Sequence, residues 1–285
     1  MPVGRPDQEP GAYGRSPHGG NRLLGPAELV AGLQRTGFDR CTTASNHSYD
    51  LGDEGVVSTI DALESAGMSW SGTARTAEED PAAVIEVRGV RIAHLSYTRY
   101  SNTDHPPEEW RVAYTENPAR VAREVTEARA AGAEVVIVSI HLSKELQHEP
   151  EASTVDFVRA VLDGADVDAV IHHGPHVVQG FERLDGTPVW WSLGNLVSGM
   201  ARPNPTDRYR DPRTRDGLAA GLRFTESDPG QWDVAATSII LCNEQASRVV
   251  HPGAELADPN LTDADLRREL EGCVSRTRQA VPDAT

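Results

Sequence analysis

The chain has few aromatic residues and no excess of positive charge. Aromatic side chains make up 5% of its 285 residues, and 27 lysines and arginines stand against 43 acidic residues. The resulting formal net charge of −16 repels nucleic-acid phosphates and anionic lipid, so we expect neither as a partner. A surface of this charge also keeps a protein in solution without any specific role.

Long apolar runs and paired cysteine motifs are also missing. No stretch approaches the ~20 apolar residues of a membrane span, and none follows the basic N-terminal residues as in a signal peptide. Cys41, Cys242 and Cys273 form an odd, widely spaced set, which predicts idle or buried thiols rather than disulfides or a metal motif. We therefore expect a cytoplasmic protein with no membrane partner. A homo-oligomer is compatible with the sequence.

The first 22 residues offer little material for a core. Residues 1–21 are rich in glycine and proline and contain a single valine and no leucine. This composition predicts a flexible tail over 1–22, or a loop strapped to the surface. We expect the main domain over 23–255 and a charged helical extension over 256–285.

Hydrophobic periodicity then alternates between helix and strand. A hairpin is expected over 83–97, with Arg88-Gly89 as its two-residue turn. Helices are predicted over 26–37, 54–66, 118–131, 153–162 and 263–280, and further strands over 38–43, 134–140, 167–171, 177–184, 188–192, 217–226 and 232–241. Two βα halves followed by an antiparallel run indicate an α/β fold, with two sheets packed face to face and helices outside.

Polar side chains cluster where predicted strands end. Asn46 and His47 follow the first strand, His141 ends the Val-rich strand, and His173 and His176 follow the next one. Ligands bind at the carboxyl ends of strands in α/β sheets, and imidazole and amide oxygen are ligands for Zn, Mn or Fe. The pattern therefore predicts a metal site.

Such a site would support hydrolysis. A metal polarises a phosphoryl or carbonyl oxygen and activates a bound water, and His47 is our candidate to protonate the leaving group. Asp50, three residues on, would orient His47. Structural roles stay open for Asn46 in a turn, for His47 at the surface and for His141 in the core. His172 would be a spare histidine, because not every histidine of this run can be a ligand. The pair Trp190-Trp191 would either pack in the core or line a pocket.

These residues carry a family resemblance. Three blocks resemble the poly-γ-glutamate capsule biosynthesis (CapA-type) family, which is similar to the calcineurin-like metallophosphoesterases. The blocks are Gly37-Phe38-Asp39 with Asn46-His47, Asp50, Gly52 and Gly55; His141 with Glu145; and His173, His176, Gln179, Glu182 and Trp191-Ser192-Leu193-Gly194-Asn195. Together they run from about Leu24 to Val197.

The resemblance implies a four-layer α/β/β/α sandwich of two mixed sheets, of the metallophosphoesterase type. By analogy, Asn46, His141 and His173 would bind one metal and His176 a second, with His47 as general acid. Contacts to a small-molecule or anionic polymer substrate would come from Glu145, Glu182, Trp191 and Asn195.

The chain departs from the family at its start. No strand ending in Gly-Asp and no later Glu ligand is visible, and Ser45, Ser48 and Ser143 stand where the family has other residues. The absent Asp bridges two metals in phosphoesterases, so we expect one divalent ion (Mn, Zn or Fe) rather than two. Either the N-terminal strands are lost upstream of Met1, or the chain is a reduced relative.

Three functions follow from these observations. The first is a metal-dependent hydrolase of a phosphate ester or a related ester or amide bond. The second is a soluble tailoring enzyme or factor in the biosynthesis of polyglutamate or an amide-linked metabolite. The third is a binding relative that has kept the fold without catalysis.

Overall fold

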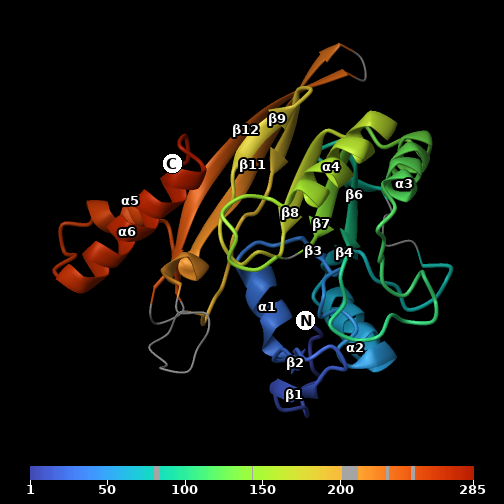
Figure 1. Cartoon of the computed structure of the whole chain (residues 1–285), viewed down its shortest axis with the longest axis horizontal. Coiled ribbons are helices and arrows are strands. Elements are labelled where there is room, and N and C mark those ends of the chain that lie inside the picture. Colours follow the sequence, from blue (N-terminus) through green and yellow to red (C-terminus); the bar gives the residue numbers. More distant parts are fainter. Residues whose placement is uncertain (80–83, 143, 201–210, 229–230, 245–247) are drawn as a thin grey trace. The chain divides into compact units, whose positions relative to one another are not determined.

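The computed structural model describes residues 1–79, 84–142, 144–200, 211–228, 231–244 and 248–285 (Figure 1). The chain forms two compact units. Unit 1 comprises Met1–Leu142 and Phe157–Val167, and unit 2 comprises Ser143–Asp156 and Asp168–Thr285. The expected domain boundaries at residues 23 and 255 stay a prediction.

Unit 1 contains a mixed sheet. Strands β5 (Ile85–Val87) and β6 (Val90–Thr98) form the expected hairpin, and β7 (Val135–His141) pairs in parallel with β6. The predicted turn is confirmed: Arg88 and Gly89 have φ of 54° and 83°, as a two-residue hairpin turn with two left-handed positions requires. Ala83, the predicted start of the hairpin, lies outside the described residues.

The predicted helices of unit 1 are present as α1 (Glu28–Arg35), α2 (Gly52–Ser65) and α3 (Pro118–Ala130). The side chain of Asn117 caps α3 by accepting a hydrogen bond from the Ala119 amide. Helix α3 packs its buried Val121 and Val125 beside β7. The short strand β3 (Arg40–Thr42) pairs in parallel with β4 (Ser69–Ser71), a strand that the periodicity did not indicate. Helix α4 spans Ala152–Gly164.

The prediction of a strand-free tail over 1–22 is wrong. Strand β1 (Gly11–Arg15) pairs antiparallel with β2 (Asn21–Leu24). Val3 is buried, its amide donates to Thr59 Oγ1 at 2.9 Å, and its carbonyl accepts from Ser58 Oγ at 2.7 Å. The segment is ordered because helices α1 and α2 supply apolar surface, and α2 also supplies hydrogen-bond partners, that its own composition lacks.

Unit 2 contains two sheets. In the first, β10 (Thr187–Trp190) pairs in parallel with β8 (Ala169–His173) and antiparallel with β9 (Phe181–Leu184). The second is antiparallel and consists of β11 (Asp216–Asp228), β12 (Gln231–Asn243) and β13 (Val249–Val250), preceded by the 3₁₀ turn η1 (Pro212–Arg215). The chain is therefore an α/β protein with mixed sheets, as predicted at that level.

Two helices follow the ribbon of β11 and β12, and α6 packs beside it (Figure 1). Helix α5 spans Pro252–Ala257, and the predicted C-terminal helix is present as α6 (Ala264–Ala280). Leu270 of α6 and Ile240 of β12 are both buried in one core cluster. Among the helices in the described parts of the chain, none combines the length and apolarity needed to cross a membrane.

The prediction of idle thiols is wrong for two of the three cysteines. Cys242 of β12 and Cys273 of α6 form a disulfide, whereas Cys41 is free. The two partners are 31 residues apart in sequence and meet only because α6 packs on β12. Their spacing alone therefore carried no sign of the bond.

Candidate functional site

His47 in unit 1 is held by Asp50. Its Nδ1 lies 2.6 Å from Asp50 Oδ2, and its side chain is 23% exposed, whereas that of Asp50 is fully buried. The contact is local, because the turn after β3 places the side chains of His47 and Asp50, three residues apart, on the same side of the turn. The predicted contact between these two residues is present.

Asp50 has few other partners. Its Oδ2 also accepts a hydrogen bond from the Leu23 amide at 2.7 Å, and within the described chain its buried Oδ1 has none. A buried carboxylate is costly unless it is paired with a cation or hydrogen-bond donors. An ionised carboxylate can only accept a hydrogen bond, so this contact requires a proton on Nδ1 of His47. The other ring nitrogen, Nε2, is then the one that gives or takes a proton.

Asn102 is the second neighbour of His47. Its Nδ2 lies 3.3 Å from Nδ1 and 3.1 Å from Nε2 of the ring, and its Oδ1 accepts from Asn46 Nδ2 at 3.3 Å. The Asn102 amide also donates to the carbonyl of Asn46 at 2.9 Å, which joins the two loops. The sequence did not indicate the contacts of Asn102 with Asn46 and His47.

Two further histidines of unit 1 lie on neighbouring strands. His141 is the last residue of β7, as predicted, and its carbonyl accepts from the Arg99 amide at 2.9 Å. His94 lies within β6 and contacts Ser139 Oγ at 2.7 Å through Nε2. Burial, followed by the charge of Arg40, lowers the pKa of His94 to about 4, so it is a neutral packing residue at pH 7.

Unit 2 carries the remaining histidines. His172 is buried, and its Nδ1 contacts the carbonyl of Trp191, which gives it the structural role that the sequence left open. His173 ends β8.

His176 adopts a left-handed backbone with φ of 64°, and its Nδ1 lies 2.9 Å from Asn195 Oδ1. Its Nε2 lies 4.0 Å from Glu145 Oε1. Three predicted site residues of unit 2 are thus brought together.

Asn195 is fixed by its own turn. Its Nδ2 donates to the Thr214 carbonyl at 2.9 Å. The preceding Gly194 has φ of 70°, and a Cβ there would lie 2.4 Å from the Asp216 carbonyl oxygen, so only glycine fits. The Leu193-Gly194-Asn195 sequence therefore positions the amide that holds His176.

The tryptophan pair packs in the core. Trp190 and Trp191 are both buried, and their indole nitrogens donate to Ser238 Oγ at 2.9 Å and to Glu182 Oε1 at 2.7 Å. Trp191 and Glu182 are thus hydrogen-bonded to each other. Their predicted contact with a substrate stays a prediction.

The predicted metal ligands are divided between the units. Asn46 and His141 belong to unit 1, and His173 and His176 to unit 2. Their nitrogen and oxygen donors suit Zn, Mn or Fe. However, no three His, Cys, Asp or Glu side chains in the described parts of the chain are grouped so that they could hold a metal ion. The expected metal centre, whose ligands come from both units, therefore stays a prediction.

The sequence is similar to two capsule biosynthesis proteins of Bacillus species. A capsule biosynthesis protein CapA of Bacillus anthracis is 27% identical over 180 residues, which cover 61% of this chain and 44% of the relative. The PGA biosynthesis protein CapA of Bacillus subtilis (strain 168) is 24% identical over 214 residues, covering 74% and 54%. The chain thus spans about half the length of these relatives.

Two solved structures show a weaker likeness. The calcineurin-like phosphoesterase YfkN from Bacillus subtilis has a TM-score of 0.48 and 15% identity, covering 88% of this chain and 72% of that one. The NAD nucleotidase of Haemophilus influenzae has a TM-score of 0.47 and 13% identity, covering 91% and 44%.

The family description "Bacterial capsule synthesis protein PGA_cap" matches residues 13–200, more than half of the chain. The chain therefore belongs to the bacterial capsule synthesis protein PGA_cap family.

Proposed function

We propose that this chain is a hydrolase of a phosphate ester or a related ester or amide bond, with His47 as its proton-transfer residue. One observation carries the proposal: a partly exposed imidazole is held 2.6 Å from a fully buried carboxylate. A buried acceptor behind an accessible histidine is the arrangement that general acid–base catalysis needs.

The proton transfer follows from this geometry. In the imidazolium form, Nε2 gives its proton to the oxygen or nitrogen of the leaving group as water attacks the phosphorus or carbonyl carbon. The ring becomes neutral and keeps the proton on Nδ1, which donates to Asp50, and the deprotonated Nε2 can then accept a hydrogen bond from Asn102 Nδ2 at 3.1 Å. The proton of the attacking water leaves to solvent. Nε2 of His47 then takes up a proton from solvent before the next turnover.

The divalent ion expected from the sequence is given no step in this mechanism, and Asn46, His141, His173 and His176 stay its predicted ligands. Dependence on Mn, Zn or Fe stays a proposal, and elemental analysis of the purified protein tests it. The four-layer α/β/β/α sandwich is likewise our proposal for the domain.

A second candidate substrate is an amide-linked polymer. Family membership and the capsule and PGA names of the relatives favour a polyglutamate or a similar metabolite. In that case the chain would be a tailoring enzyme or factor in its synthesis. Loss of the polymer or metabolite on gene deletion would support this role, and an unchanged product would count against it.

A panel of four chromogenic substrates separates these options. It consists of p-nitrophenyl phosphate, bis-p-nitrophenyl phosphate, p-nitrophenyl acetate and γ-glutamyl-p-nitroanilide, each with and without Mn²⁺ or Zn²⁺. We expect turnover of at least one that falls sharply in His47→Gln. No turnover of any, with poly-γ-glutamate still bound by His47→Ala and His141→Ala, would instead identify a non-catalytic binding relative.

A further inference from the structure

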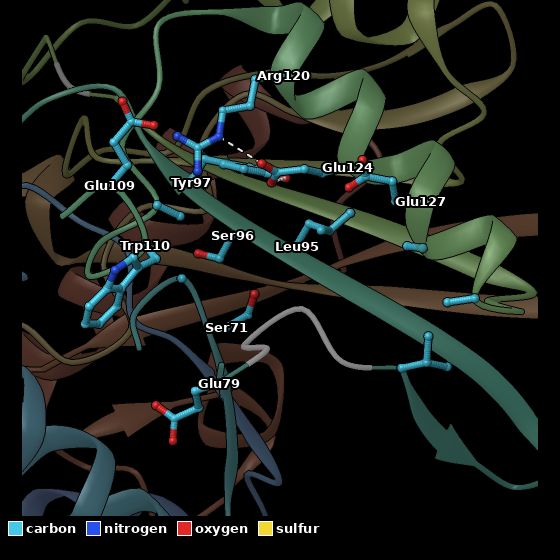
Figure 2. A pocket seen from close by; sticks show the side chains of 15 residues that line it. Ser71, Glu79, Leu95, Ser96, Tyr97, Glu109, Trp110, Arg120, Glu124 and Glu127 are labelled. Atoms are coloured by element: carbon cyan, nitrogen blue, oxygen red, sulfur yellow. Dashed lines mark hydrogen bonds and ion pairs between the residues drawn. The ribbon is translucent and has the colours of Figure 1, made fainter. Parts of the chain in front are cut away.

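Unit 1 contains a cavity of about 600 Å³ that is separate from His47, Asp50 and Asn102 (Figure 2). Its walls come from β6, α3, the segment around Ser71 and the loop that carries Glu109 and Trp110. This volume lies within the range of small-molecule sites, roughly 300–1,000 Å³. The proposed hydrolysis at His47 gives this cavity no role.

Ser96 marks the cavity as more than a packing defect. Its side chain lines the cavity and is 2% exposed, yet its Oγ has no hydrogen-bond partner in the part of the chain that the structure describes. Figure 2 shows the hydroxyl on the side of the cavity where Trp110 lies. Buried hydroxyls are usually satisfied, so an unsatisfied one in a cavity wall indicates a group that a ligand can bond.

The charge around the cavity is unbalanced. Four glutamates and one arginine line it. Glu124 is engaged by Arg120 Nε at 2.8 Å and by the Tyr97 hydroxyl at 2.6 Å. Burial, followed by the charge of Glu124, raises the pKa of Tyr97, so its hydroxyl stays a donor.

The other three glutamates differ in their pairing. Glu79 is paired with Arg75 at 2.6 Å, and Arg75 also contacts Asp61 and Glu64. Glu127 has a contact of 3.6 Å with Arg123, and both of these side chains are mostly exposed. Glu109 is exposed. Within the described chain Glu109 has no ion pair, and the Arg123 contact of Glu127 is long and exposed to solvent, so these two carboxylates are the least neutralised at the cavity and attract a cation.

We propose that this cavity binds a small organic cation, an aliphatic amine whose ammonium group is attracted by Glu109 and Glu127 and whose second polar group bonds Ser96. Leu95, Ala113 and Ala128 give the walls an apolar surface that suits a hydrocarbon chain. A bare metal ion would leave that apolar surface uncovered.

Three four-carbon probes of different charge test this proposal by calorimetry: 1,4-diaminobutane, 1,4-butanediol and succinate, at equal ionic strength. We expect the diamine to bind roughly tenfold tighter than the diol and succinate to give no heat. Equal affinity for the diamine and the diol, or no binding of the diamine, would overturn the proposal.

Matched variants locate the site. The double variant Glu109→Gln/Glu127→Gln should weaken diamine binding by roughly fivefold, whereas Glu28→Gln/Glu54→Gln, which removes the same charge from helices α1 and α2, should not. Ser96→Ala should also weaken binding, with melting curves to show that it is folded. Unchanged affinity in Glu109→Gln/Glu127→Gln would refute the site even if Ser96→Ala failed to fold. His47→Gln should bind the diamine as the wild type does, so this test does not depend on the hydrolase proposal.

Discussion

The Nδ1 atom of His47 lies 2.6 Å from Oδ2 of Asp50, whose side chain is fully buried. The buried carboxylate has few other hydrogen-bond donors, so it holds a proton on Nδ1 of His47 throughout the proposed reaction. His47 is at the same time accessible enough to meet a substrate.

Replacing Asp50 by Asn should lower kcat about 100-fold, because the amide can present its NH₂ group to Nδ1 and select the other tautomer. The measurement is kcat on whichever substrate the wild type turns over. Asp53→Asn is the matched control, since Asp53 is exposed and pairs with Tyr49 and Arg111. Equal rates in the two variants would show that Asp50 does not act through His47.

Asn102→Ala should lower kcat about tenfold and change the ¹H–¹⁵N signals of the His47 ring, because its amide contacts both ring nitrogens. Ser101→Ala, in the same loop, is the control. Ring signals that match those of the wild type would remove the positioning role from Asn102, whatever the rate.

His94 should make unfolding sensitive to acid. Its pKa is about 4 in the folded protein and about 6.5 in the unfolded chain, so the unfolded chain binds the proton first as the pH falls. Stability from neutral His94 is therefore present above pH 6.5 and decreases towards pH 4, by roughly 2–3 kcal/mol between pH 7 and pH 4.5.

Urea unfolding at these two pH values measures the effect. His94→Gln should show a smaller loss of unfolding free energy on acidification than the wild type, whereas His18→Gln, at an exposed position, should not. An identical loss in His94→Gln would mean that His94 titrates normally in the folded state.

Reduction of the Cys242–Cys273 bond should destabilise the protein by about 4 kcal/mol, given the sequence separation of 31 residues between the two cysteines. The unfolding midpoint of the wild type should fall on adding dithiothreitol. Cys41→Ala should keep this dependence and Cys242→Ala/Cys273→Ala should lose it. A wild-type midpoint that ignores the reductant would argue that the bond does not form.

The regular elements could be predicted because their signals are local. The run of valines before Ser139 indicated a buried strand, and Arg88-Gly89 between two apolar runs indicated a hairpin. The ordered conformation of residues 1–22 could not be predicted, because the surface that buries Val3 comes from helices α1 and α2. The Cys242–Cys273 bond was hidden for the same reason, since it depends on how α6 packs on β12.

The candidate site shows the same limit. His47 and Asp50 are three residues apart, so their contact could be inferred from the sequence. Asn102 is 55 residues from His47, and its place depends on the hydrogen bond between two loops. Nothing local to Asn102 distinguishes it from an ordinary loop asparagine.

The rate of the best substrate of the four-compound panel, compared between the wild type and His47→Gln, tests the central claim most directly. With both proteins equally folded by circular dichroism, our account predicts a loss of at least about 100-fold in kcat/KM for His47→Gln. Equal values for the two proteins would show that bond cleavage does not use His47 and would contradict the account.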